Sequence, residues 1–298
     1  LLLQKPAARL ALAFLSGGLL IKAGFIPFHS WAIEVEQVAP APVASMFAGV
    51  LRPVMGLYVL IRVGFVVFGQ ASPLPAVLLV FGLLSIIVGG YLSSREVRLQ
   101  KLFTYSSISQ LGYVAVGFGL ATPLGLIAGY FYFFNLILVI PLLFLSAGSI
   151  FYALETNRLT KPGEPSPYMP ITYFAFMGAH LVVAGILPGG IFFSKLLLLL
   201  AVFQENRYFT GLILILMSLF TLPTMIRSVR RAFSDESENR LFAIKKGGIL
   251  IKLPLVLMVI FVFLTPILFF SPFRELIIEG VPGVLLDSLS YSLRSLIR

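Results

Sequence analysis

The chain of 298 residues contains no cysteine and few charged residues. The lack of cysteine excludes disulfides, thiol catalysis and cysteine-ligated clusters within this chain. Charged residues make up only 11% of the sequence, whereas soluble domains carry roughly 25%. Hydrophobic residues reach 59%, and the mean hydropathy is +1.01. The composition therefore predicts a polytopic membrane protein, because only helices and closed barrels satisfy their backbone in lipid.

Acidic side chains are also scarce within the apolar runs. The twelve Asp and Glu residues are expected in loops or at the ends of spans, with none buried in the middle of one. Sodium prefers hard oxygen ligands, so a sodium site made by this chain alone is not expected, although carbonyls at helix breaks could contribute. The sequence shows no metal-binding cluster, phosphate loop, nucleophile triad or cofactor fingerprint.

The sequence contains long continuous apolar runs. Their length of about 20 residues, without alternation, predicts membrane-spanning helices and not barrel strands. We expect an all-α polytopic membrane protein with about eight transmembrane helices, two of them broken, and a C-terminal amphipathic helix. The expected spans cover residues 8–36, 40–68, 74–93, 101–121, 124–154, 171–204, 208–233 and 249–271, and the tail covers 273–298.

The formal net charge of +10 is explained by basic residues in the loops. Alternate loops of an eight-span protein lie on the same side, and one side carries more Lys and Arg than the other. Because such residues collect in cytoplasmic loops, that side is expected to be cytoplasmic. Both ends of the chain are then expected outside, and nucleic acid is not an expected partner.

Two of the expected spans are interrupted. In the first, Lys22 is followed by Pro27, which removes a backbone donor. The sixth, 171–204, would extend about 51 Å as a straight helix, against roughly 30 Å of hydrocarbon. Its sequence LPGGIFF supplies a break, which leaves open one broken helix or two short ones. Paired interrupted segments that carry ionisable residues indicate a transport site at a repeat interface.

Three basic residues inside the spans are singled out: Lys22, Arg52 and Lys195. A charge in hydrocarbon costs about 2.5–3.5 kcal/mol on insertion scales, so each needs a reason. A desolvated lysine can exchange protons with water, which makes Lys22 and Lys195 candidates for a proton relay. The alternative is snorkelling or capping of carbonyls at a break. Arg52 cannot be deprotonated, so we expect it to order water or to pair with a carboxylate elsewhere.

Histidines and small polar residues are further candidates for an ion pathway. His180, in the sixth span, fits a proton relay or a hydrogen-bonded structural histidine equally well. His29 is expected near the first break or the membrane interface. The start of the fourth span is unusually polar, and its side chains either bond neighbouring helices or line a hydrated path. These side chains are Ser106, Ser107, Ser109, Gln110 and Tyr113.

Three stretches carry a resemblance to a known family. They read KAGFIPFHSWAIEVEQVAPAPVASMFAGVL, LQKLFTYSSISQLGYV and GILPGGIFFSKLLLL. Their order and spacing resemble those of the antiporter-like subunits of respiratory complex I, membrane-bound hydrogenases and related reductases, and Mrp-type sodium/proton antiporters. The resemblance covers nearly the whole chain up to about residue 233. It implies two inverted five-helix repeats, each with a broken helix and a half-channel, joined by a central row of lysines and histidines.

The resemblance also implies roles and boundaries. Lys22 and Lys195 match the broken-helix lysines of the two repeats, and Glu34 matches an acidic position after the first break. The transmembrane domain, 1–271, would comprise the end of the first repeat (1–69), the second repeat (70–233) and an extra span (249–271), followed by the amphipathic tail (272–298). The chain departs from ionisable positions of the family at Ala48, Val54, Leu136, Ile140 and Leu196.

The family's buried glutamate lies on helices before the first broken helix, where this chain begins. We therefore expect another polypeptide to supply a carboxylate, unless this member has lost part of its channel. The expected function is that of an antiporter-like membrane subunit of a multisubunit redox-driven complex, taking part in proton or sodium translocation in the cytoplasmic (inner) membrane. No cofactor is expected in this chain; iron–sulfur or metal centres are expected in partner subunits.

Two other functions remain open. The chain could be a subunit of an Mrp-type cation/proton antiporter or of an ion-coupled uptake complex. It could also be a non-conducting scaffold whose channel has degenerated, because five ionisable positions of the family are replaced. In each case the lipid bilayer and other membrane subunits are the expected partners.

Overall fold

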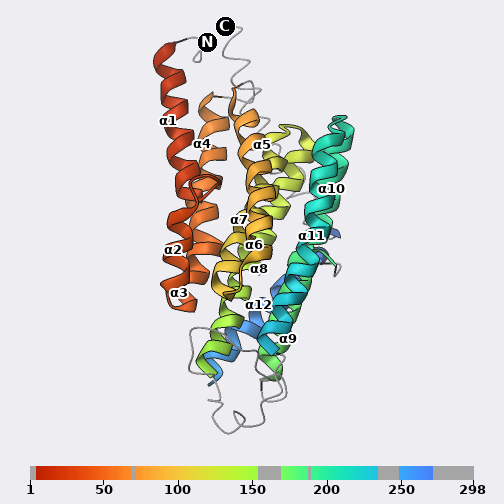
Figure 1. The fold of residues 1–298 in the computed structure, drawn as a ribbon. Coiled ribbons are helices and arrows are strands. Elements are labelled where there is room, and N and C mark those ends of the chain that lie inside the picture. Colours follow the sequence, from red (N-terminus) through yellow and green to blue (C-terminus); the bar gives the residue numbers. More distant parts are fainter. Residues whose placement is uncertain (1–4, 69–71, 154–168, 187–188, 234–247, 271–298) are drawn as a thin grey trace.

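A computed structural model describes residues 5–68, 72–153, 169–186, 189–233 and 248–270. The regular structure within these ranges is helical, and the longer helices run side by side along one direction (Figure 1). The α-helices are α1 (Pro6–Ala23), α2 (Ser30–Val38), α3 (Ala41–Met46), α4 (Val59–Phe68), α5 (Leu74–Leu84), α6 (Gly90–Arg95), α7 (Leu99–Gly119), α8 (Pro123–Ala153), α9 (Pro170–Ala184), α10 (Gly190–Gln204), α11 (Tyr208–Phe233) and α12 (Ile249–Phe270).

Each of the eight expected spans is matched by one helix or by a run of helices. Six segments are long and apolar enough to cross a membrane: 6–23, 41–65, 74–95, 123–153, 208–233 and 249–267. Two shorter apolar helices, α9 and α10, together match the sixth expected span. α7, which matches the fourth, carries the polar run around Ser106 and is not among the six. The fold is thus that of a polytopic helical membrane protein.

Both predicted helix breaks are present. The first expected span consists of α1 and α2, separated by residues 24–29. The sixth consists of α9 and α10, separated by residues 185–189. The sixth span is therefore a broken span made of two half-helices, α9 and α10.

The second span contains an irregularity that the sequence did not predict. Two π-helical segments, η2 (Phe47–Leu51) and η3 (Pro53–Tyr58), lie on either side of Arg52, between α3 and α4. A third, η4 (Ser85–Gly89), joins α5 to α6. π-helical turns are rare and are frequent at functional sites. Here η2 and η3 flank Arg52, the arginine that the sequence analysis singled out.

The core of the bundle is formed around α7 and α8. α8 packs against α3, α7, α9, α10 and α12, and α7 also packs against α2 and α5. Nearly every residue of α7 from Leu102 onward is buried, including its serines and Gln110. α7 therefore lies between the two broken spans and contacts helices of both.

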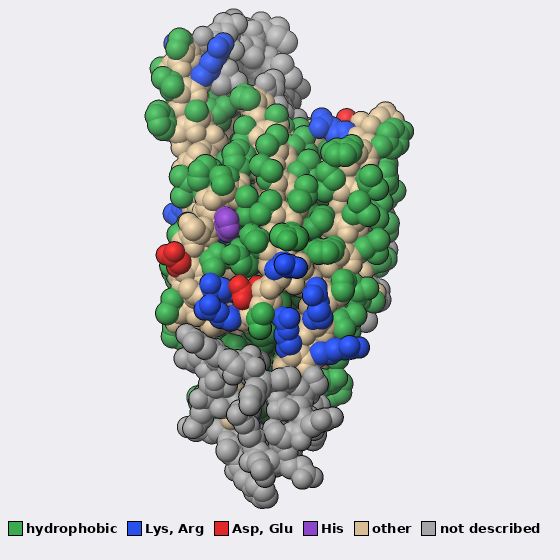
Figure 2. All heavy atoms as spheres, in the orientation of Figure 1, with side chains coloured by type: hydrophobic (Ala, Val, Ile, Leu, Met, Phe, Trp, Pro, Cys, Tyr) green, Lys and Arg blue, Asp and Glu red, His purple; other side chains and the backbone are tan. Residues whose placement is uncertain are grey.

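The outer surface is apolar in its middle. Figure 2 shows hydrophobic side chains over most of the visible face and lysine and arginine side chains mainly in a band towards its lower end. Exposed arginines at helix ends include Arg95 of α6, Arg98 before α7, and Arg227 and Arg230 in the last turns of α11. This distribution fits an apolar belt in lipid with basic residues near a membrane interface. The expected tail at 272–298 lies outside the described residues.

Candidate ion-pathway site at the two helix breaks

The first break begins with a glycine. After Ala23 the chain turns at Gly24, whose φ of 74° lies in the left-handed region that glycine adopts without strain. The Gly24 amide donates to the Ile21 carbonyl at 3.0 Å, and the Phe25 amide donates to the Leu20 carbonyl at 3.1 Å. This pair of bonds is a Schellman motif, which ends a helix cleanly. Carbonyls of the last turn remain for side-chain donors.

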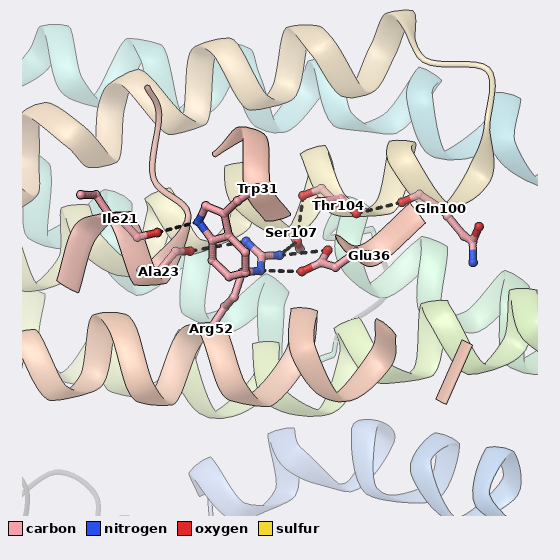
Figure 3. A network of polar contacts seen from close by, with 8 residues as sticks. All are labelled: Ile21, Ala23, Trp31, Glu36, Arg52, Gln100, Thr104 and Ser107. Atoms are coloured by element: carbon pink, nitrogen blue, oxygen red, sulfur yellow. Dashed lines mark hydrogen bonds and ion pairs between the residues drawn. The ribbon is translucent and has the colours of Figure 1, made fainter. Parts of the chain in front are cut away.

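Two side chains donate to that last turn, as Figure 3 shows. The Trp31 indole Nε1 donates to the Ile21 carbonyl at 2.8 Å, and Arg52 Nη1 lies 3.4 Å from the Ala23 carbonyl. The carbonyl end of a helix carries partial negative charge, so it favours the guanidinium of Arg52. Trp31 and Arg52 therefore stabilise the C-terminal end of α1 at the break.

Arg52 is the centre of a buried ion pair. Its Nε donates to Glu36 Oε1 at 2.6 Å, and its Nη2 contacts Glu36 Oε2 at 3.4 Å and donates to the Ser107 hydroxyl. The side chain of Arg52 is 2% exposed and that of Glu36 is 0% exposed. Ser107 in turn donates to the Thr104 carbonyl on α7. The network joins α2, α7 and the π-helical region (Figure 3).

This pair corrects one prediction and gives Arg52 its partner. We expected no carboxylate buried in the middle of a span, but Glu36 lies inside α2 and is completely buried. The prediction was wrong because it placed residue 36 at the end of a span, whereas α2 continues to Val38. Helical spacing from Ala32 and Ile33 puts Glu36 on their buried face. The expectation that Arg52 pairs with a carboxylate is matched by this contact.

The second break repeats the same backbone motif. Gly185 has a φ of 75°, and its amide donates to the Val182 carbonyl at 3.0 Å. The Ile186 amide donates to the Leu181 carbonyl at 3.1 Å. Lys195 of α10 reaches back to this end of α9, where its Nζ donates to the Val183 carbonyl at 3.1 Å. A buried cation thus contacts the carbonyl end of the first half-helix at both breaks.

Lys195 has an aromatic neighbour in place of a carboxylate. It is 7% exposed, and its Nζ lies 5.3 Å from the centroid of the Tyr113 ring of α7. The Tyr113 ring stacks on the Tyr132 ring of α8, with centroids 5.6 Å apart and an interplanar angle of 12°. The Tyr132 hydroxyl donates to the side-chain carbonyl of Gln110, one turn before Tyr113. Among the described residues, the Glu36–Arg52 contact is the one salt bridge.

The lysine expected at the first break faces outward. Lys22 is exposed in the described structure, as is Glu34 of α2. His29 is half-buried, and its Nδ1 lies 3.3 Å from the Pro27 carbonyl. The structure therefore does not bring Lys22 into contact with the Arg52 network.

The other predicted residues are buried near α7. His180 is 1% exposed; its Nδ1 lies 2.6 Å from the Phe176 carbonyl, and its ring packs edge-on against Phe103 of α7. Ser109 donates to the Ile86 carbonyl at 3.1 Å. Three polar atoms on this part of the bundle are buried without a hydrogen-bond partner within the described residues: His180 Nε2, Ser106 Oγ and Gln110 Nε2. Buried polar atoms normally bond to protein or water, so these atoms are suited to hold water.

Sequence reasoning missed two members of these clusters. Tyr132 was not singled out, because an aromatic residue in an apolar span is usually core. Glu36 was recognised only as an acidic residue at a span end. Its helical register with the apolar residues of α2 was the signal that could have identified it.

Two broken helices, each with a buried cation at its break, are features that membrane proteins with ion sites share, and they define an integral membrane protein of the broken-helix class. Residues 1–221 match the family described as NADH:quinone oxidoreductase/Mrp antiporter, TM. The chain belongs to this family. The family match confirms the resemblance that the three sequence stretches indicated.

Individual relatives agree with the family assignment. Subunit N of the NADH-quinone oxidoreductase of Desulforudis audaxviator is 29% identical over 235 residues, which is 78% of this chain and 47% of that protein. A Na⁺/H⁺ antiporter subunit of Alkalihalophilus pseudofirmus is 28% identical, over 74% of this chain and 44% of that protein. The chain thus spans about half the length of the curated relatives it matches.

A solved structure gives the same result for the fold. The membrane-bound sulfane sulfur reductase, an archaeal respiratory membrane complex, contains a chain that is 27% identical and superposes with a TM-score of 0.79. The match covers 87% of this chain and 45% of that one. The antiporter-like helical fold is therefore confirmed.

Proposed function

We propose that this chain is an antiporter-like membrane subunit of a multisubunit redox-driven complex and takes part in proton or sodium translocation. The observation that supports this function is Lys195, a buried amine at the carbonyl end of a broken helix. Removal from water favours the neutral form of an amine, and the negative helix end favours its charged form. A lysine held between these opposing effects is suited to accept and release a proton.

The partners follow from Lys22. It is exposed on α1 next to exposed apolar side chains such as Ile21, at 46%, and Phe14, at 78%. A lysine that faced hydrocarbon would cost about 2.5–3.5 kcal/mol on insertion scales. We propose that a further transmembrane segment covers this face of α1 and donates a carboxylate to Lys22. Lys22 and Lys195, with His180, Ser106 and Ser109 between them, would then form the pathway.

We also propose a membrane location, an orientation and repeat boundaries for the chain. The complex would lie in the cytoplasmic (inner) membrane, with both ends of this chain outside, and its iron–sulfur or metal centres would belong to partner subunits. Residues 1–69 and 70–233 would be parts of two repeats, followed by the extra span at 249–271 and the tail at 272–298. His29 and Glu34 would line the entrance near the first break.

A second candidate function is supported by the similarity to the Na⁺/H⁺ antiporter subunit of Alkalihalophilus pseudofirmus. The chain would then belong to an Mrp-type antiporter without electron transfer. Mild-detergent extraction from native membranes, a native gel and mass spectrometry of the band that contains this chain separate the two. Comigration with iron–sulfur subunits is the expected result. Comigration with small membrane subunits alone would favour the antiporter.

Two substitutions test whether the chain conducts ions at all. We expect Lys195→Ala and Lys22→Ala each to reduce ion translocation by sealed membrane vesicles at least tenfold, while electron transfer or complex assembly persists. Arg207→Ala is the matched control, because Arg207 is an exposed basic residue between α10 and α11. Unchanged translocation in both lysine variants would contradict the proposal and favour the non-conducting scaffold.

A further inference from the structure

In the described part of the chain, no carboxylate forms a salt bridge with Lys195. α10 packs against α7, α8, α9, α11 and α12. In the described parts of these helices the buried titratable side chains are Tyr113 of α7, Tyr132 of α8 and His180 of α9. The other titratable side chains of α11 and α12 are exposed or half-buried: Tyr208, Arg227, Arg230, Arg231 and Lys252. An ammonium at Lys195 therefore has a backbone carbonyl and a tyrosine face as its nearest described partners.

The tyrosine face is fixed in place from two sides. The Tyr113 side chain is 1% exposed, and its hydroxyl donates to the Leu214 carbonyl of α11 at 3.3 Å. Its ring stacks almost parallel on Tyr132, which is fully buried and bonded to Gln110. Because the Tyr113 ring is held by its stacking on Tyr132 as well as by its hydroxyl, its face stays against the Lys195 amine. The negative face of an aromatic ring attracts a cation within about 6 Å, and the attraction is stronger away from water.

We propose that Tyr113 is a positioning residue for ion translocation, which stabilises the protonated form of Lys195 through its ring face. The inference rests on the proposed function of Lys195 and deepens it. A neutral amine gains much less from the ring than an ammonium does, so the ring acts on one of the two states. Tyr132 and Gln110 support the ring through stacking and a hydrogen bond.

The experiment measures the protonation of Lys195 directly. The chain is labelled with ¹³C-lysine, and the ε-carbon signal of Lys195 is followed by NMR from pH 5 to 11 in the purified complex. The signal is assigned by its loss in Lys195→Arg. We expect Tyr113→Phe, which keeps the ring, to titrate like the parent protein. Tyr113→Leu removes the ring, and its midpoint should move to lower pH by about one unit.

An isosteric pair protects the test against misfolding. Position 113 is replaced by phenylalanine and by pentafluorophenylalanine, which has a nearly equal shape and an inverted ring charge distribution. The midpoint should fall in the fluorinated protein, and the pH profile of ion translocation in vesicles should move with it. Equal midpoints in both proteins would overturn the role of Tyr113.

The two proposals fail in different ways. A midpoint that moves while no variant of Lys195 alters translocation would confirm that Tyr113 stabilises the protonated amine, but it would overturn the proposed function and with it the role of Tyr113 in translocation. A midpoint that stays constant while Lys195→Ala abolishes translocation would do the reverse. The NMR titration does not depend on transport, so the two readouts are independent.

Discussion

The two broken spans share a backbone motif but neutralise their cations differently. Each first half-helix ends at a left-handed glycine, with φ of 74° at Gly24 and 75° at Gly185. At the first break the cation is Arg52, which is paired with a buried carboxylate. At the second it is Lys195, which has a carbonyl and an aromatic face. Arginine stays charged in proteins, whereas a buried lysine can become neutral. The first break is therefore built around a permanent ion pair, and the second around a charge that can change.

The largest difference between the breaks should appear when the carboxylate is removed. Glu36→Ala leaves the Arg52 guanidinium buried without its partner, which costs about 3–5 kcal/mol. We expect the variant to lose thermal stability in mild detergent and to accumulate poorly in membranes. Wild-type stability would show that Arg52 finds water or another acceptor.

A double substitution serves as the control for that prediction. Replacing both partners with apolar residues, as in Glu36→Leu with Arg52→Met, removes the buried charges together. The double variant should be more stable than Glu36→Ala alone. The same experiment has no equivalent at Lys195, whose described neighbours include no carboxylate. The stability loss on removal of a carboxylate therefore distinguishes the first break from the second.

The shared glycine motif predicts similar losses at both breaks. A Cβ in the left-handed region costs roughly 1–2 kcal/mol, so Gly24→Ala and Gly185→Ala should each lower stability by that amount. The effect should be larger at Gly24, because its Cβ would lie 3.2 Å from Arg52 Nη1, against 3.4 Å from Lys195 Cδ at Gly185. Thermal denaturation measured in parallel would reveal the order.

The matched control lies in α9 itself. A Cβ at Gly178 would make only an ordinary contact of 3.5 Å with Phe263, and this glycine has ordinary helical backbone angles. We expect Gly178→Ala to be neutral or slightly stabilising. Equal losses in all three variants would show that the left-handed turn does not set the cost.

The smallest expected effect concerns Trp31, which has no described counterpart at the second break. Trp31→Phe keeps an aromatic ring and removes the bond from Nε1 to the Ile21 carbonyl. A single hydrogen bond contributes about 0.5–1.5 kcal/mol, and the half-buried position of Trp31 favours the lower end of that range. Tyr208→Phe, which removes an exposed bond to Asn206, is the control and should have no measurable effect on stability.

The sequence was sufficient for the fold and for the positions of both breaks. Lysine followed by proline, and a proline before two glycines, marked the interruptions because both residue types disturb a helix. Composition and run length marked the spans. Three stretches with the order and spacing of a known family predicted the class of protein. The family match over residues 1–221 confirmed it.

The partners of the cations could not be predicted in the same way. Periodicity identifies the face of a helix that is buried, but it does not say which residue of another helix lies opposite. Glu36 and Arg52 are 16 positions apart, and α3 and one π-helical segment, η2, lie between them. The Lys195–Tyr113 contact joins α10 to α7 across 82 positions. Both depend on tertiary packing, which no local pattern encodes.

α7 separates the residues that contact the cations of the two breaks. Ser107, which bonds Arg52, and Tyr113, which faces Lys195, are six residues apart on this helix, or about 9 Å along its axis. Two isolated positive charges about 10 Å apart repel by roughly 1.7 kcal/mol at an effective dielectric constant of 20. Because Glu36 neutralises Arg52, the second break experiences the weaker field of a dipole. The Glu36 carboxylate thereby lowers the electrostatic cost of a positive charge on Lys195.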